Sequence, residues 1–112
     1  LSQMTSMPGS SFSGVAPPLS AADAALAAQL RADVTHLAVT IGERNLGQQP
    51  EALEATAVWL EGQLADAGYV VESERYPVKG QTVRNLIADL RGSERPGEQI
   101  VIGAHYDSAE GT

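Results

Sequence analysis

One short segment carries the residue types that perform acid–base or metal chemistry. His105, Asp107 and Ser108 follow directly after the unbroken apolar run Ile100–Ala104, a pattern typical of a strand buried on both faces. Functional sites in open α/β sheets form outside the carboxyl ends of the strands, so the segment is well placed for function. If the extended conformation continues, His105 and Asp107 lie on the same side of the chain. A carboxylate in that position can hold one ring nitrogen of the histidine and leave the other free for a metal ion.

Other interpretations of these residues stay open. A His-x-Asp sequence also fits a surface loop in which the histidine is simply hydrogen-bonded, although the small Gly103 and Ala104 leave room beside the backbone and favour a site. Ser108 has no histidine in the arrangement of a nucleophile and its base, which argues against a serine hydrolase. His36 lies in a helical pattern and is interpreted as an ordinary helix residue.

Several further side chains are assigned structural roles. Arg44 and Arg84 can pair with carboxylates or bind a peptide terminus, and structural pairing is the preferred interpretation. Trp59 is expected to pack a helix against its neighbour. The acidic residues of the later segments are expected on solvated faces: Glu72, Glu74, Glu94 and Glu98.

Two amphipathic helices are predicted before this segment. Ser20 and Asp23 have the spacing of a capping box, and apolar residues then recur on one helical face from about 21 to 40, with Gly42 ending the helix. Pro50 at a first helical position begins a second helix, and Gly68 supplies its C-terminal cap. The apolar positions on the two helices are Leu26, Leu30, Val34, Leu37 and Ile41, then Leu53, Ala57, Leu60 and Leu64.

Strands are expected in the second half of the chain. Residues 69–76 and 82–90 are rich in strand-forming residues, and the turn-like 77–81 between them indicates an antiparallel hairpin. With the apolar run 100–104 this gives the order helix, helix, strand, strand, strand. A strand buried on both faces needs neighbours on both sides, so the pattern indicates the front part of a larger α/β domain.

Composition excludes several classes of partner. The 112 residues include 14 acidic and 7 basic side chains, for a formal net charge of −7. This balance argues against nucleic acid, which needs a basic stripe, and against anionic membrane surfaces. No apolar run approaches the roughly 20 residues that span a bilayer. The chain has no cysteine, which excludes disulfides, zinc ribbons and a thiol nucleophile.

Residues 1–19 differ in composition from the rest. They are rich in Ser, Pro, Gly and Met without a helical or strand period, which predicts a flexible arm. Residues 20–112 are then expected to form one folded unit that is incomplete at its C-terminus. Arms of this kind commonly follow an export signal, which favours a secreted or periplasmic protein.

The segment Ile100–Ser108, with Gly111 and Thr112 behind it, resembles the first metal-ligand segment of the co-catalytic zinc aminopeptidases of clan MH, of the aminopeptidase Y and aminopeptidase S type. Val83–Ala88 is similar to the strand that precedes it there, and the Ile41–Arg44 turn and the helix over 51–67 also resemble family features. The similarity runs from about 35 to 112, and His105–Ser108 is its most specific part.

The resemblance implies a three-layer α/β/α zinc-exopeptidase domain with a mixed sheet, of which this chain is the N-terminal part. It implies that His105 is a zinc ligand and that Asp107 supports it. The family's remaining ligands and its general-base glutamate belong to positions beyond Thr112. Since catalytic zinc normally has at least three protein ligands, the 112 residues alone are expected to be inactive and to bind zinc weakly, whereas the complete enzyme would hold two zinc ions and hydrolyse N-terminal residues from peptides.

Two alternatives remain. One is a glutaminyl cyclase-like acyltransferase of the same fold, which also carries a His-Tyr-Asp-Ser segment but uses a single zinc ion and does not employ this histidine as a ligand. The other is a non-catalytic module that associates with itself or a partner through an uncovered sheet edge, because an unpaired strand is a template for another chain.

Overall fold

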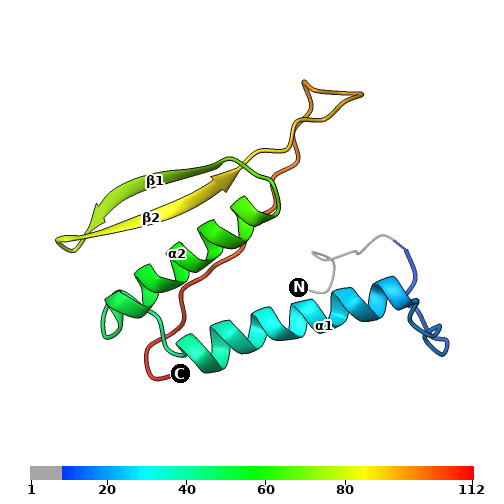
Figure 1. Ribbon diagram of the computed structural model, residues 1–112, viewed down its shortest axis with the longest axis horizontal. Helices are drawn as coiled ribbons and strands as arrows, with labels where there is room; N and C mark the ends of the chain where they lie inside the picture. Colours follow the sequence, from blue (N-terminus) through cyan, green and yellow to red (C-terminus); the bar gives the residue numbers. More distant parts are fainter. Residues whose placement is uncertain (1–8) are drawn as a thin grey trace, which may run out of the picture.

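The computed structural model describes residues 9–112 as a mixed α/β arrangement (Figure 1). The element order is α1 (Ala21–Thr35), the π-helix η1 (His36–Ile41), α2 (Pro50–Asp66), β1 (Val71–Val78) and β2 (Gln81–Ala88). Helix α2 contacts η1 and both strands of the hairpin, and the chain after β2 returns alongside α2 so that its C-terminus lies near the loop that precedes α2 (Figure 1). Residues 1–8 of the predicted arm lie outside the described residues, and residues 9–19 contain no helix or strand.

The first helix begins where the sequence predicts. The Ser20 side chain accepts a hydrogen bond from the Asp23 backbone, and the Asp23 carboxylate accepts one from the Ser20 backbone, which completes the capping box. The last six residues form the π-helix η1, and Gly42 ends it at φ +76° with its N–H bonded to the Leu37 carbonyl. The expected single helix over 21–40 is therefore an α-helix continued by a π-helical turn.

Helix α2 follows its predicted signals closely. Pro50 stands in its first turn, and Gly68 adopts φ +93° just after its last residues, a conformation that glycine adopts without a steric penalty. Trp59 of α2 packs against His36 of η1, with ring centroids 4.6 Å apart. Both residues thus have the structural roles that the sequence indicates.

The hairpin is confirmed, with a tighter turn than expected. β1 and β2 pair antiparallel in the register Val71↔Ala88 to Val78↔Gln81, so strand pairing includes Pro77 and Val78 and only Lys79 and Gly80 form the turn. Both turn residues have positive φ, +49° and +81°, as a two-residue turn of type I′ requires.

The expected third strand is not present in the described residues. Residues 100–104 pair with no strand, and the sheet consists of β1 and β2. A strand needs a neighbouring strand within hydrogen-bonding distance, and no described segment offers one here. Ile100, Val101 and Ile102 are accordingly 91–94% exposed.

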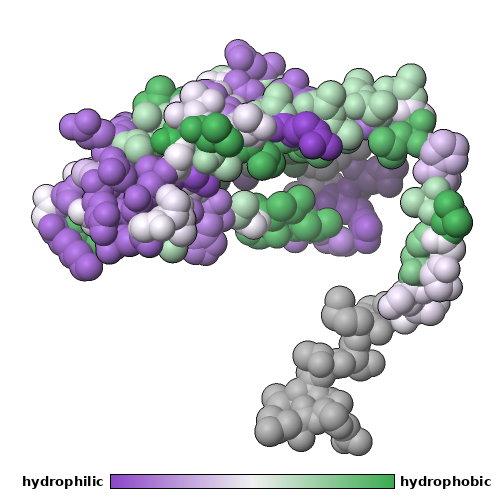
Figure 2. Space-filling model, turned by 90° about the horizontal axis from the view of Figure 1, so that it is seen from below, coloured by the Kyte–Doolittle hydropathy of each residue, from purple (hydrophilic) through white to green (hydrophobic). Residues whose placement is uncertain are grey.

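The apolar faces of these elements are mostly uncovered. Among the described residues Ala57 is the one buried hydrophobic side chain, and the other buried residues are polar: Asn45, Thr56 and Arg84. Helix α1 contacts no described element other than η1, which continues it in sequence, so Leu26, Leu30 and Val34 stay more than half exposed. Figure 2 shows the resulting apolar patches on the surface.

The overall dimensions agree with this open packing. The radius of gyration is 18.3 Å, whereas a compact domain of this length has about 13 Å. The accessible surface is 9610 Å², whereas a compact monomer of this mass exposes about 5,900 Å². The arrangement therefore buries markedly less surface than a compact domain of this size.

We expect the 112-residue chain by itself to unfold in a broad transition of low cooperativity, because one buried hydrophobic side chain cannot offset the entropy of ordering the chain. Urea titration followed by far-ultraviolet circular dichroism and by Trp59 fluorescence measures this. A steep transition that coincides for the two probes would show that the described packing suffices for a cooperative fold.

Candidate functional site

His105 and Asp107 lie together at the surface. The His105 Nδ1 and Asp107 Oδ1 atoms are 3.1 Å apart, and the two side chains are 94% and 56% exposed. Because an ionised carboxylate only accepts hydrogen bonds, this contact fits an imidazole that carries a proton on Nδ1. The pairing that the sequence predicts for these two residues is therefore present.

Tyr106 and Ser108, which alternate with His105 and Asp107 along the chain, attach this segment to the rest of the protein. Tyr106 and Ser108 are partly buried where His105 and Asp107 are exposed, which is the alternation of an extended chain. The Tyr106 hydroxyl donates a hydrogen bond to the Arg84 carbonyl on β2. The Ser108 backbone N–H donates to the Arg44 carbonyl at 2.8 Å.

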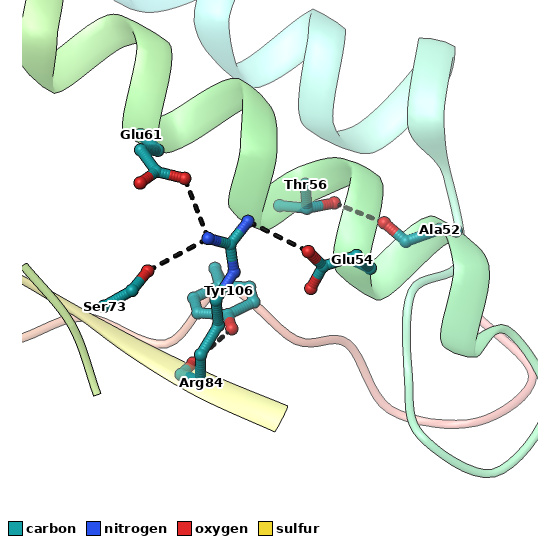
Figure 3. Close-up of polar contacts among 7 residues, drawn as sticks. All are labelled: Ala52, Glu54, Thr56, Glu61, Ser73, Arg84 and Tyr106. Carbon is teal, nitrogen blue, oxygen red and sulfur yellow. Dashed lines mark hydrogen bonds and ion pairs between the residues drawn. The ribbon is translucent and has the colours of Figure 1, made fainter. Parts of the chain in front are cut away.

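Arg84 joins three elements beside this segment. The residue is 4% exposed. Its guanidinium contacts Glu54 at 3.0 Å and Glu61 at 2.8 Å, both on α2. It also donates a hydrogen bond to the Ser73 hydroxyl on β1 at 3.0 Å. Figure 3 shows the guanidinium between α2 and the hairpin, with Tyr106 below it. The structural pairing predicted for Arg84 is confirmed.

Arg44 pairs differently from the expectation. Its side chain binds backbone carbonyls and not carboxylates: Nε donates to Tyr106 at 2.7 Å, and Nη1 donates to Leu37 and Gly42, each at 2.9 Å. Sequence reasoning missed this role because carbonyl acceptors leave no mark in the residue types. The one local signal is the position of Arg44 two residues after the glycine that ends η1.

A second attachment lies further along the C-terminal segment. The Gly111 N–H donates to the Glu43 carboxylate at 2.8 Å, and the same carboxylate oxygen accepts a hydrogen bond from the Asn45 side chain. An open cleft of about 400 Å³ lies nearby, between the loop at 45–47, the hairpin turn and residues 108–110. The loop before α2 therefore contacts the C-terminal segment at two points, Ser108 and Gly111.

The described residues do not assemble a larger ligand set around His105. Within residues 9–112, no group of three or more His, Asp or Glu side chains is arranged to hold a metal ion. In the same part of the chain, no helix is long and apolar enough to cross a membrane. His105 and Asp107 are thus the predicted site residues that the structure brings together, and His36 lies apart from them on η1.

The comparisons with known proteins place the chain beside a bacterial relative. The chain is 32% identical over 81 residues to the Escherichia coli K12 protein named "Uncharacterized protein YfbL", and the match covers 72% of this chain and 24% of that protein. The chain therefore spans about a quarter of the relative's length. No family model matches the chain, and no solved structure matches it.

Burial raises the pKa of the Tyr106 phenol above its ordinary value of 10.0, with the Glu54 charge adding to the effect and the Arg84 charge opposing it. Since the folded pKa exceeds the unfolded one, folding is unaffected below about pH 10 and is progressively destabilised above it. We expect the ultraviolet difference between the chain and its Tyr106→Phe variant, followed against pH, to show a tyrosine whose pKa lies above the ordinary value. Ionisation of Tyr106 at the ordinary pKa of a tyrosine would contradict the buried placement.

Proposed function

We propose that this chain is the N-terminal part of a zinc-dependent aminopeptidase, an enzyme that hydrolyses N-terminal residues from peptides. The observation that carries the proposal is the His105–Asp107 contact of 3.1 Å on an imidazole whose other nitrogen is open to solvent. Histidines that bind metal ions usually donate their second ring N–H to a carboxylate or carbonyl in this way. The likeness of His105–Ser108 to the ligand segment of clan MH aminopeptidases adds support.

The residues of this chain fit zinc as a partial ligand set. His105 would supply one ligand through Nε2, and Asp107 would fix its tautomer and raise its basicity. Zinc, when bound, supplies Lewis-acid polarisation of a peptide carbonyl and an activated water near neutral pH. Further ligands and a general base would come from residues outside this chain, so that the 112 residues alone are expected to be inactive.

The proposed fold accommodates the exposed parts of the structure. In a three-layer α/β/α domain with a mixed sheet, the segment 100–104 would become an inner strand, and the uncovered face of α1 would pack against other elements. The exposure of Ile100–Ile102 and of the α1 apolar residues supports the proposal that both faces have partners in the complete protein. Activity on peptides, export from the cytoplasm and the second zinc ion belong to the same proposal.

The first experiment is to sequence the source gene past the codon for Thr112. An open reading frame that encodes further Asp, Glu and His residues with the spacing of the family's ligands would support the proposal. A stop codon directly after Thr112 would contradict it.

The complete protein then allows a direct test of His105. We expect His105→Ala to abolish zinc-dependent release of amino acids from peptides, and Asp107→Asn to weaken zinc binding about ten- to a hundredfold. His36→Gln is the matched control, because it changes the chain's other histidine on η1. Release of amino acids that is unchanged in His105→Ala would contradict the proposed ligand, and cyclisation of N-terminal glutamine without release of amino acids would identify the acyltransferase alternative.

A second candidate function, association through the C-terminal segment, is favoured by a separate observation. Residues 99–105 make no backbone hydrogen bond to any other described residue, and Ile100, Val101 and Ile102 are exposed. An apolar extended segment with free N–H and C=O groups is a template for pairing with another chain.

For this candidate we expect the 112-residue chain to form dimers or larger species in light scattering after size exclusion. Val101→Lys should return it toward the monomer, because a charge in an exposed strand disfavours edge pairing, whereas Val15→Lys in the exposed N-terminal region should not. A chain that elutes as a single monomer at all concentrations would exclude this function.

A further inference from the structure

Arg44 binds the backbone of the residue that lies between His105 and Asp107. Its Nε donates to the carbonyl of Tyr106, the residue that separates the pair. Its own backbone N–H donates to the Ser108 hydroxyl at 3.1 Å, and its carbonyl accepts from the Ser108 N–H at 2.8 Å. Three hydrogen bonds therefore fix one residue inside the His-x-Asp sequence and one directly after it.

The same guanidinium is held on its other side by the end of η1. Nη1 donates to the carbonyls of Leu37 and Gly42, and the Leu37 carbonyl also accepts the Gly42 N–H that closes the π-helical turn. The planar guanidinium thus joins three carbonyls from two separate stretches of the chain. A lysine side chain ends in a compact ammonium group without a planar set of N–H donors, so it cannot hold the three carbonyls in the same fixed geometry.

The exposed pair has no comparable anchor of its own. The His105 side chain is 94% exposed, and its hydrogen-bond partner among the described residues is Asp107. Two exposed side chains would sample several rotamers in water, at a cost in entropy for each one that is fixed. The extended backbone geometry, with Tyr106 and Ser108 facing the protein, is what brings the two side chains to the same side.

We propose that Arg44 is a positioning residue for the His105–Asp107 pair. By holding the Tyr106 carbonyl, it keeps the peptide in the extended form in which Asp107 accepts the Nδ1 proton and Nε2 faces outward. The benefit for zinc rests on the proposed function, whereas the effect on the imidazole tautomer does not require any metal.

The tautomer gives a test that is independent of activity. In the metal-free complete protein with ¹⁵N-labelled histidine, at a pH where the ring is neutral, the Nδ1 and Nε2 shifts of His105 report which nitrogen holds the proton. The signal is assigned by its loss in His105→Gln. We expect Nδ1–H to predominate in the unaltered protein and a mixture of both tautomers in Arg44→Gln.

Two further variants separate positioning from general stability. Arg44→Lys should recover part of the Nδ1–H population, since it restores a positively charged donor group without the planar fork. Arg31→Gln removes a guanidinium from the exposed side of α1 and should leave the tautomer unchanged. If Arg44→Gln does not fold, Arg44→Lys and the unaltered protein carry the same test.

Zinc affinity, measured by competition with a chelator, supplies the second measurement. We expect Arg44→Gln to bind zinc about tenfold more weakly, in the range seen when a residue behind a metal ligand is removed. A lower melting temperature with unchanged tautomer and unchanged zinc affinity would overturn the proposal, as would a mixed tautomer in the unaltered protein. Absence of zinc binding in the unaltered protein would contradict the proposed function, while the tautomer would still decide the role of Arg44.

Discussion

The packing of helix α2 on the hairpin depends on a guanidinium buried between them. Burial of a charge is costly unless it is paired and hydrogen-bonded, and Arg84 meets this demand with Glu54, Glu61 and Ser73. Its Nε is buried without a partner among the described residues, and the two glutamates are partly exposed, so water screens the ion pairs. We therefore regard the cluster as a device that sets where α2 lies on the hairpin, more than as a large source of stability.

The backbone of the same residue continues the connection toward the candidate site. The Arg84 carbonyl accepts the Tyr106 hydroxyl, and the Tyr106 carbonyl accepts the Arg44 guanidinium. A continuous series of polar contacts thus runs from α2 through β2 and the C-terminal segment to the end of η1. His105 and Asp107 are presented by this series although neither takes part in it.

Local features were predictable from the sequence, and long-range ones were not. Some signals act only on neighbouring residues and can therefore be recognised in the sequence. They are the capping box at Ser20, the proline that begins α2 and the glycines after the helices. The contact between His105 and Asp107 joins near neighbours in the sequence, so the alternation of an extended chain was enough to predict it. The carbonyl contacts of Arg44 and the buried position of Arg84 depend on segments far apart in sequence. The run 100–104 has a strand's composition, but strand formation requires a neighbour that residues 9–112 do not provide.

The separation of Arg44 and Ser108, 64 residues, bears on the order of folding. Helices and a hairpin with a two-residue turn form from local contacts within microseconds. Closing a loop of this length carries an entropic cost that later contacts must offset. The hydrogen bonds around Tyr106 and Ser108 are therefore expected among the last to form. A nascent or partly unfolded chain would then hold its helices and hairpin before it holds an ordered His105–Asp107 pair, so the chemistry-bearing residues would take their geometry only from a chain that is already folded.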